Sequence, residues 1–157
     1  MTYVFDTNVF SQLFHSFYRS QFPTLWSNFD SLVDKGLITS TREVSREIED
    51  DRVKSLREWA KDKHELFPAP TADEALFVRK IFNVKHFQQI IEQKKLLKGG
   101  KNADPFVIAR ASVLEKGTVV TMESETRNGA NIPNICRRFS IPCMSLEAFM
   151  KQEQWVF

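Results

Sequence analysis

The chain has 157 residues, of which 42% are hydrophobic and 27% charged, and its net charge is +2. This length predicts a single domain over residues 1–157, and the 14 phenylalanines exclude a disordered chain because they can fill a core. No apolar run approaches the roughly 18 to 20 residues of a membrane span, so we expect no membrane partner and a cytoplasmic protein.

The first motif is a short apolar run that ends at an acid. Residues 3–5 are typical of a buried strand, and the polar triplet 6–8 precedes apolar residues at helical spacing. We therefore predict a strand, a turn and a helix. Ligands of open α/β sheets lie beyond the carboxyl ends of the strands, which is where Asp6 would be.

The segment from Pro23 to Gly100 is predicted to be mostly helical. One helix begins at Pro23 and ends at Gly36, and a capping-box pattern at residues 40–43 begins a second one. The apolar stripe from Val44 to Trp59 extends this second helix, with Glu47 on its edge. A second capping box at residues 71–74 introduces two further helices, the last of which ends at the Gly99-Gly100 pair.

The final third alternates helices and strands. Asp104 followed by Pro105 predicts a helix start with Asp104 as N-cap. The β-branched run 118–122 predicts a strand that leads into Glu123 and Glu125. A short helix over 132–139, an edge strand over 141–144 and a terminal helix follow. This alternation predicts an α/β fold with a parallel sheet covered on both faces.

Four acids are candidates for one site. Asp6 and Glu123 follow strands, Asp104 begins a helix that returns from the same sheet edge, and Glu47 lies on a helix edge. Carboxylates gathered in this way repel one another unless a cation lies between them. Oxygen ligands favour Mg²⁺ or Mn²⁺, which can polarise a phosphodiester and activate water. The alternatives are that Asp104 only caps its helix, that Glu47 is solvated, and that Glu125 replaces Glu123.

The motifs resemble those of PIN-domain ribonucleases, in the same order and over nearly the whole chain. Four segments carry the resemblance, at residues 4–9, 44–48, 103–111 and 119–123. It implies a PIN-like three-layer α/β/α fold with a short, mostly parallel central sheet and a helical middle segment. It also implies a Mg²⁺- or Mn²⁺-dependent endoribonuclease, and many small members resemble toxins of toxin–antitoxin pairs. RNA, a small antitoxin protein and a second copy of the chain are the partners that follow from the resemblance.

The resemblance also implies roles for individual residues. Asp6, Glu47 and Asp104 match the catalytic, metal-binding acids, and Asn8 and Thr121 match polar supports around them. The fourth acid of the family is commonly Asp, whereas this chain has Glu123. We take Glu123 as the fourth catalytic and metal-binding acid, which holds or orients the attacking water or a second ion.

The run from Arg79 to Lys101 contains seven basic residues and one acid. It is either a solvated helix face or a phosphate-binding patch, in which the nucleic-acid contacts would come from Lys94, Lys95, Lys98 and Lys101.

Two other hypotheses compete with the nuclease hypothesis. A phosphatase of the haloacid-dehalogenase kind also begins with a strand and an Asp, but it needs a second Asp where this chain has Asn8. A catalytically degenerate PIN-like module that binds RNA or a protein is the second alternative.

Overall fold

A four-stranded parallel sheet lies at the centre of the computed structural model, which describes residues 1–157. The strand order is β2-β1-β3-β4. The strands are β1 (Thr2–Phe5), β2 (Ile38–Thr39), β3 (Gly117–Thr121) and β4 (Cys143–Ser145). Every pair of neighbours is parallel, and β1 pairs with β3 in a register that places Val4 opposite Val119. The carboxyl ends of β1 and β3 therefore lie side by side.

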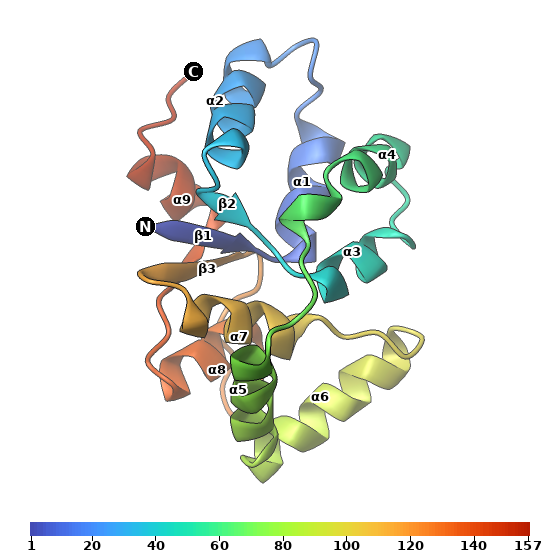
Figure 1. Cartoon of the computed structure of the whole chain (residues 1–157), viewed down its shortest axis with the longest axis vertical. Coiled ribbons are helices and arrows are strands. Elements are labelled where there is room, and N and C mark those ends of the chain that lie inside the picture. Colours follow the sequence, from blue (N-terminus) through green and yellow to red (C-terminus); the bar gives the residue numbers. More distant parts are fainter.

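Helices cover both faces of this sheet (Figure 1). Side chains alternate along β1, so Tyr3 and Phe5 share one face, where both rings pack on Phe149. That face is covered by α1 (Thr7–Ser16), α2 (Pro23–Asp34) and α9 (Leu146–Gln152). On the other face lie α7 (Asp104–Val113) and α8 (Ile132–Arg138). The expected PIN-like α/β/α architecture is confirmed.

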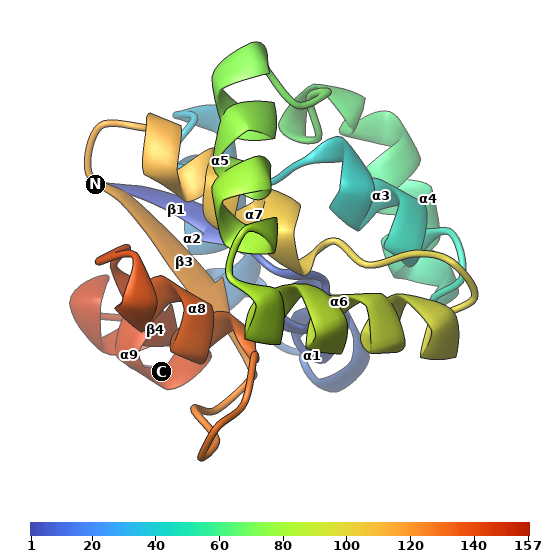
Figure 2. The same ribbon diagram turned by 90° about the horizontal axis from the view of Figure 1, so that it is seen from below.

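The middle segment is helical, as expected. It contains α3 (Arg42–Ile48), α4 (Lys54–Asp62), the 3₁₀ turn η1 (His64–Leu66), α5 (Ala72–Phe82) and α6 (Lys85–Leu97). α5 packs on α7, and α6 then extends across the lower part of the molecule (Figures 1 and 2). No helix in the chain is both long and apolar enough to cross a membrane.

The prediction of one helix from the first capping-box pattern to Trp59 was wrong. The chain leaves the helix after Ile48, and the Asp51 carboxylate accepts a hydrogen bond from the Val53 backbone N–H at 2.8 Å. This local contact competes with helix continuation. The capping box itself is also absent. The Ser40 hydroxyl donates to the Phe5 carbonyl oxygen at 2.7 Å, Thr41 occupies the N-cap position without a side-chain cap, and Glu43 pairs with Arg42.

The second predicted capping box is present at the start of α5. The Thr71 hydroxyl accepts from the Glu74 N–H at 3.2 Å, and the Glu74 carboxylate accepts from the Thr71 N–H at 3.1 Å. Glu74 also lies 3.8 Å from the Arg110 guanidinium of α7. The box therefore fixes both the start of α5 and its contact with α7.

Replacing Thr71 by Ala is expected to destabilise the protein by about 1 kcal/mol, because the cap hydroxyl is lost. Chemical denaturation of the wild type and of Thr71→Ala measures this difference. For comparison, Ser145→Ala removes the N-cap of another helix, α9, where the Ser145 hydroxyl accepts from the Ala148 N–H. Equal stability of wild type and Thr71→Ala would contradict the assigned role of the box.

Candidate functional site

Three carboxylates from distant parts of the chain meet at the carboxyl edge of the sheet. Asp6 follows β1, Glu123 follows β3 and Asp104 is the first residue of α7. Each contributes one oxygen to a group in which all oxygens lie within 4.8 Å of one another. Asp6 and Asp104 are buried and Glu123 is half-buried. We call these three residues the acidic cluster.

The Asp6 carboxylate is held by α1 and β3. Its Oδ1 accepts from the Thr7 backbone N–H at 2.8 Å, and its Oδ2 accepts from the Thr121 hydroxyl at 3.1 Å. Burial raises the pKa of Asp6 well above its ordinary value, and the negative charges of Asp104 and Glu123 raise it further. A neighbouring cation would offset this cost of the ionised form.

Asp104 does not cap its helix, so the prediction of an N-cap was wrong by one residue. Ala103 occupies the N-cap position, and the Asp104 side chain makes no cap hydrogen bond. The Asp104 backbone N–H instead donates to the Asn102 side-chain oxygen at 3.1 Å. Its carboxylate is therefore available to the acidic cluster.

Glu123, rather than Glu125, belongs to the cluster. One oxygen of Glu123 accepts from the Ile132 N–H at 2.8 Å, and burial followed by the charge of Asp104 raises the pKa of Glu123. Glu125 lies outside and forms an ion pair with Arg137 at 2.9 Å. Glu123 directly follows Met122, and its side chain, which is longer than that of Asp, reaches the cluster.

Glu47 lies beside the three-residue cluster and joins the elements around it. Its Oε1 accepts from the Thr7 hydroxyl at 2.6 Å, and its Oε2 accepts from the Ala103 N–H at 3.2 Å. These contacts connect α3 to the beginnings of α1 and α7. Lys98 lies 3.5 Å from Glu47 and 3.8 Å from Asp104, which makes it the charged link between Glu47 and the cluster.

Two of the predicted nucleic-acid-binding lysines approach the acids directly. Lys94 lies 3.5 Å from Asp104 and 3.8 Å from Glu123, and it donates to the Asn131 side chain at 2.9 Å. Burial lowers the pKa of Lys98, but the charges of Asp104 and Glu47 outweigh that effect and raise it overall. The net positive charge that α6 offers to a ligand is thus reduced by its own contacts.

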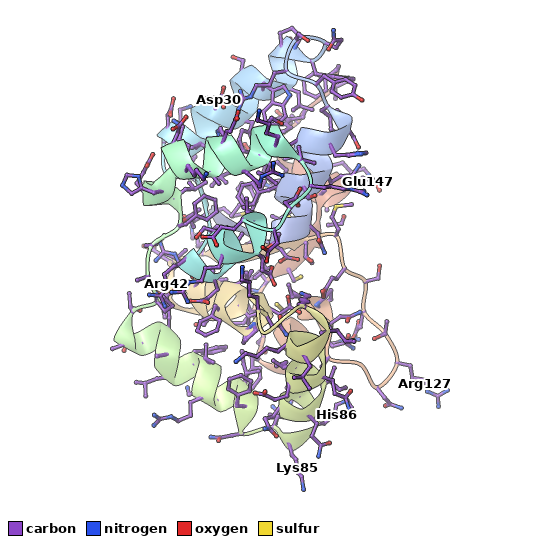
Figure 3. The ribbon with its side chains drawn as sticks, turned by 90° about the vertical axis from the view of Figure 1, so that its right-hand side faces the viewer. Asp30, Arg42, Lys85, His86, Arg127 and Glu147 are labelled. Carbon is purple, nitrogen blue, oxygen red and sulfur yellow. The ribbon has the colours of Figure 1, made fainter.

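The rest of the basic run is dispersed. Lys101 pairs with Asp50 at 2.9 Å, whereas Lys95 is exposed and has no ion pair. Figure 3 shows Lys85 at the lower end of α6, where it points away from the body. The basic residues therefore do not form one continuous patch.

The acidic cluster fits a hard divalent cation. All three donors are carboxylate oxygens, which Mg²⁺ and Mn²⁺ prefer over soft ligands. Asp6, Asp104 and Glu123 would hold the ion, with Thr121 fixing the orientation of Asp6. Such an ion would polarise a phosphodiester and activate a water molecule.

Sequence reasoning missed three residues around the cluster. Thr7 holds Glu47, Asn102 binds the backbone of Asp104, and Asn131 binds Lys94. The position of Thr7 in the first helical turn after Asp6 was a usable signal, whereas the Lys94–Asn131 contact joins residues 37 positions apart. Asn8, a predicted support, is exposed and lines a groove beside Glu123.

Comparison with known proteins agrees with this architecture. A chain of the crystal structure of VapBC2 from Rickettsia felis bound to a DNA fragment from their promoter is similar, with a TM-score of 0.52 and 15% sequence identity. The match covers 92% of this chain and 98% of that chain, and at this identity it supports the fold alone. No curated protein matches. The family described as "Domain of unknown function (DUF4411)" matches residues 3–157, and the chain therefore belongs to that family.

Proposed function

We propose that residues 1–157 form a single PIN-like domain that acts as a metal-dependent endoribonuclease, the toxin of a toxin–antitoxin pair. The observation that carries the proposal is the acidic cluster, in which three segments each bring one carboxylate oxygen within 4.8 Å of the others. Asp6 and Asp104 are almost completely buried, and Asp6 forms no ion pair, which is costly for an ionised carboxylate. A bound cation would offset this cost.

The residues around the cluster have distinct tasks in this proposal. Asp6, Asp104 and Glu123 hold Mg²⁺ or Mn²⁺, and Glu47 keeps the beginnings of α1 and α7 in place. The ammonium groups of Lys94 and Lys98 already lie beside the carboxylates, so they can contact a phosphate that reaches the site. Lys95 and Lys101 would contact other phosphates, farther along the RNA chain.

The toxin assignment rests on the resemblance of the sequence motifs to PIN-domain ribonucleases, and the fold shared with a chain of VapBC2 is consistent with it. A small antitoxin that covers the acidic cluster and a second copy of the chain are the protein partners we propose. Such an enzyme would act on cytoplasmic RNA.

The test is cleavage of a mixed set of single-stranded and structured RNAs by the wild-type protein in Mg²⁺, in Mn²⁺ and in EDTA. We expect cleavage in at least one metal and none in EDTA, because the carboxylates alone supply no Lewis acid that could polarise the phosphodiester and activate water. A folded protein that binds RNA in all three conditions and never cuts it would contradict the nuclease. That result would favour the degenerate RNA-binding module.

A further inference from the structure

A polar groove of about 280 Å³ opens beside the acidic cluster. It lies along α1, next to the turn that follows α3 and the residue that follows β3. Besides Glu123, its lining consists of Asn8, Ser11, Gln12, His15, Arg52 and Met122. Because Glu123 belongs both to the groove and to the acidic cluster, a ligand in the groove would be in contact with the proposed catalytic centre.

One face of α1 forms the floor of the groove. Asn8, Ser11, Gln12 and His15 have the i, i+3, i+4, i+7 spacing of a single helical face. The Gln12 amide donates to the Ser16 hydroxyl at 2.9 Å, which leaves its carbonyl oxygen free to accept. The side chains of Asn8, Ser11 and His15 make no hydrogen bond within the chain. The floor therefore presents several unused donors and acceptors.

The walls of the groove add a free cation and an exposed apolar group. Arg52 is exposed and forms no ion pair, although nearby Asp50 and Asp51 have partners elsewhere. A guanidinium matches the geometry of phosphate oxygens. Met122 is 44% exposed directly after β3, and its flexible thioether can pack on a flat ring. The solvated face of α1 alone would have neither an unpaired guanidinium nor an exposed thioether.

We propose that this groove binds the nucleotide of single-stranded RNA adjacent to the bond that the acidic cluster hydrolyses, an inference that rests on the proposed function. Arg52 binds the phosphate, Met122 packs on the base, and the amides of Asn8 and Gln12 pair with its edge. Bases of single-stranded RNA expose these edges, whereas paired bases do not. From Asn8 to His15 the groove follows about 10 Å of helix, enough for one or two nucleotides.

The experiment measures binding of a fluorescein-labelled single-stranded RNA pentamer to the full chain in EDTA, where metal-dependent cleavage is absent. The variant is Gln12→Ala combined with Arg52→Gln, and both residues are exposed, so the fold should persist. We expect its Kd to rise about tenfold, from the loss of two polar contacts. The matched control is Lys61→Gln, which removes one positive charge from exposed α4 surface outside the groove and should leave the Kd within about twofold.

Equal affinity of the double variant and the wild type would overturn the inference, as would an equal loss in Lys61→Gln. A cleavage assay on the same pentamer with Mn²⁺ separates this failure from failure of the proposed function. If the wild type cuts and the double variant cuts with an unchanged KM, the nuclease stands and the groove is not its subsite. If the wild type does not cut but binds through Gln12 and Arg52, the proposed function fails while the groove remains an RNA-binding site.

Discussion

Asp6→Asn and Asp104→Asn are each expected to reduce metal-dependent RNA cleavage by about 100-fold or more, because each removes a charged ligand of the proposed ion. Asn is nearly the same size as Asp and can keep the hydrogen bonds from the Thr7 N–H and with the Thr121 hydroxyl. The loss in Asp6→Asn would therefore report on charge rather than on folding. The measurement is the initial rate of RNA cleavage in Mn²⁺.

Asp6→Asn should also stabilise the metal-free protein, by about 1–2 kcal/mol at neutral pH. Burial and the charges of Asp104 and Glu123 raise the pKa of Asp6, so the folded state favours the protonated carboxyl. Between the ordinary pKa of 3.8 and the raised pKa, the folded protein thus binds more protons than the unfolded chain. Its stability falls as the pH rises through the raised pKa, and the Asn variant lacks this part of the fall.

Thermal unfolding in EDTA at a series of pH values tests the prediction for Asp6. The control is Asp73→Asn, which changes an exposed acid in the first turn of α5 and should follow the wild-type profile. A stability difference between wild type and Asp6→Asn that does not change with pH would contradict a raised pKa of Asp6 in the folded protein. Cleavage by Asp6→Asn at the wild-type rate would contradict the assignment of Asp6 as a metal ligand.

The strand-then-acid pattern is what made the centre of this site predictable. Residues 3–5 and 118–122 have apolar sequences that favour buried strands, and parallel strands place their following residues on one edge. That reasoning requires only local sequence and the parallel direction of the strands, and it identified Asp6 and Glu123. This pattern was not enough to predict the position of Asp104 correctly. The N-cap is Ala103, one residue before the predicted one, and the Asn102 side chain accepts a hydrogen bond from the Asp104 backbone N–H.

The surroundings of the site were less predictable for a physical reason. Lys94 and Lys98 look like surface charges in the sequence, since their helix has charged residues on several sides. Only the packing of α5 on α7 brings α6 close enough for these side chains to reach the carboxylates. The break between α3 and α4 depends on a side-chain contact of Asp51, which competes with an otherwise helical apolar stripe.

Lys94→Met is expected to destabilise the metal-free protein by about 2 kcal/mol, since Asp104 and Glu123 lose a charged partner. A divalent ion supplies positive charge to the same carboxylates, so saturating Mg²⁺ should restore most of this stability. The rise in Tm on adding Mg²⁺ should therefore be larger in the variant than in the wild type.

Lys95→Met is the matched control for this effect. Lys95 is the next residue of α6, is exposed and has no ion pair, so its replacement removes the same charge without touching the acidic cluster. Thermal unfolding with EDTA and with Mg²⁺ compares the two variants. Equal losses in both would show that Lys94 acts only through the overall charge of the protein. A Mg²⁺ response of Lys94→Met no larger than that of the wild type would mean that lysine and ion do not share these carboxylates.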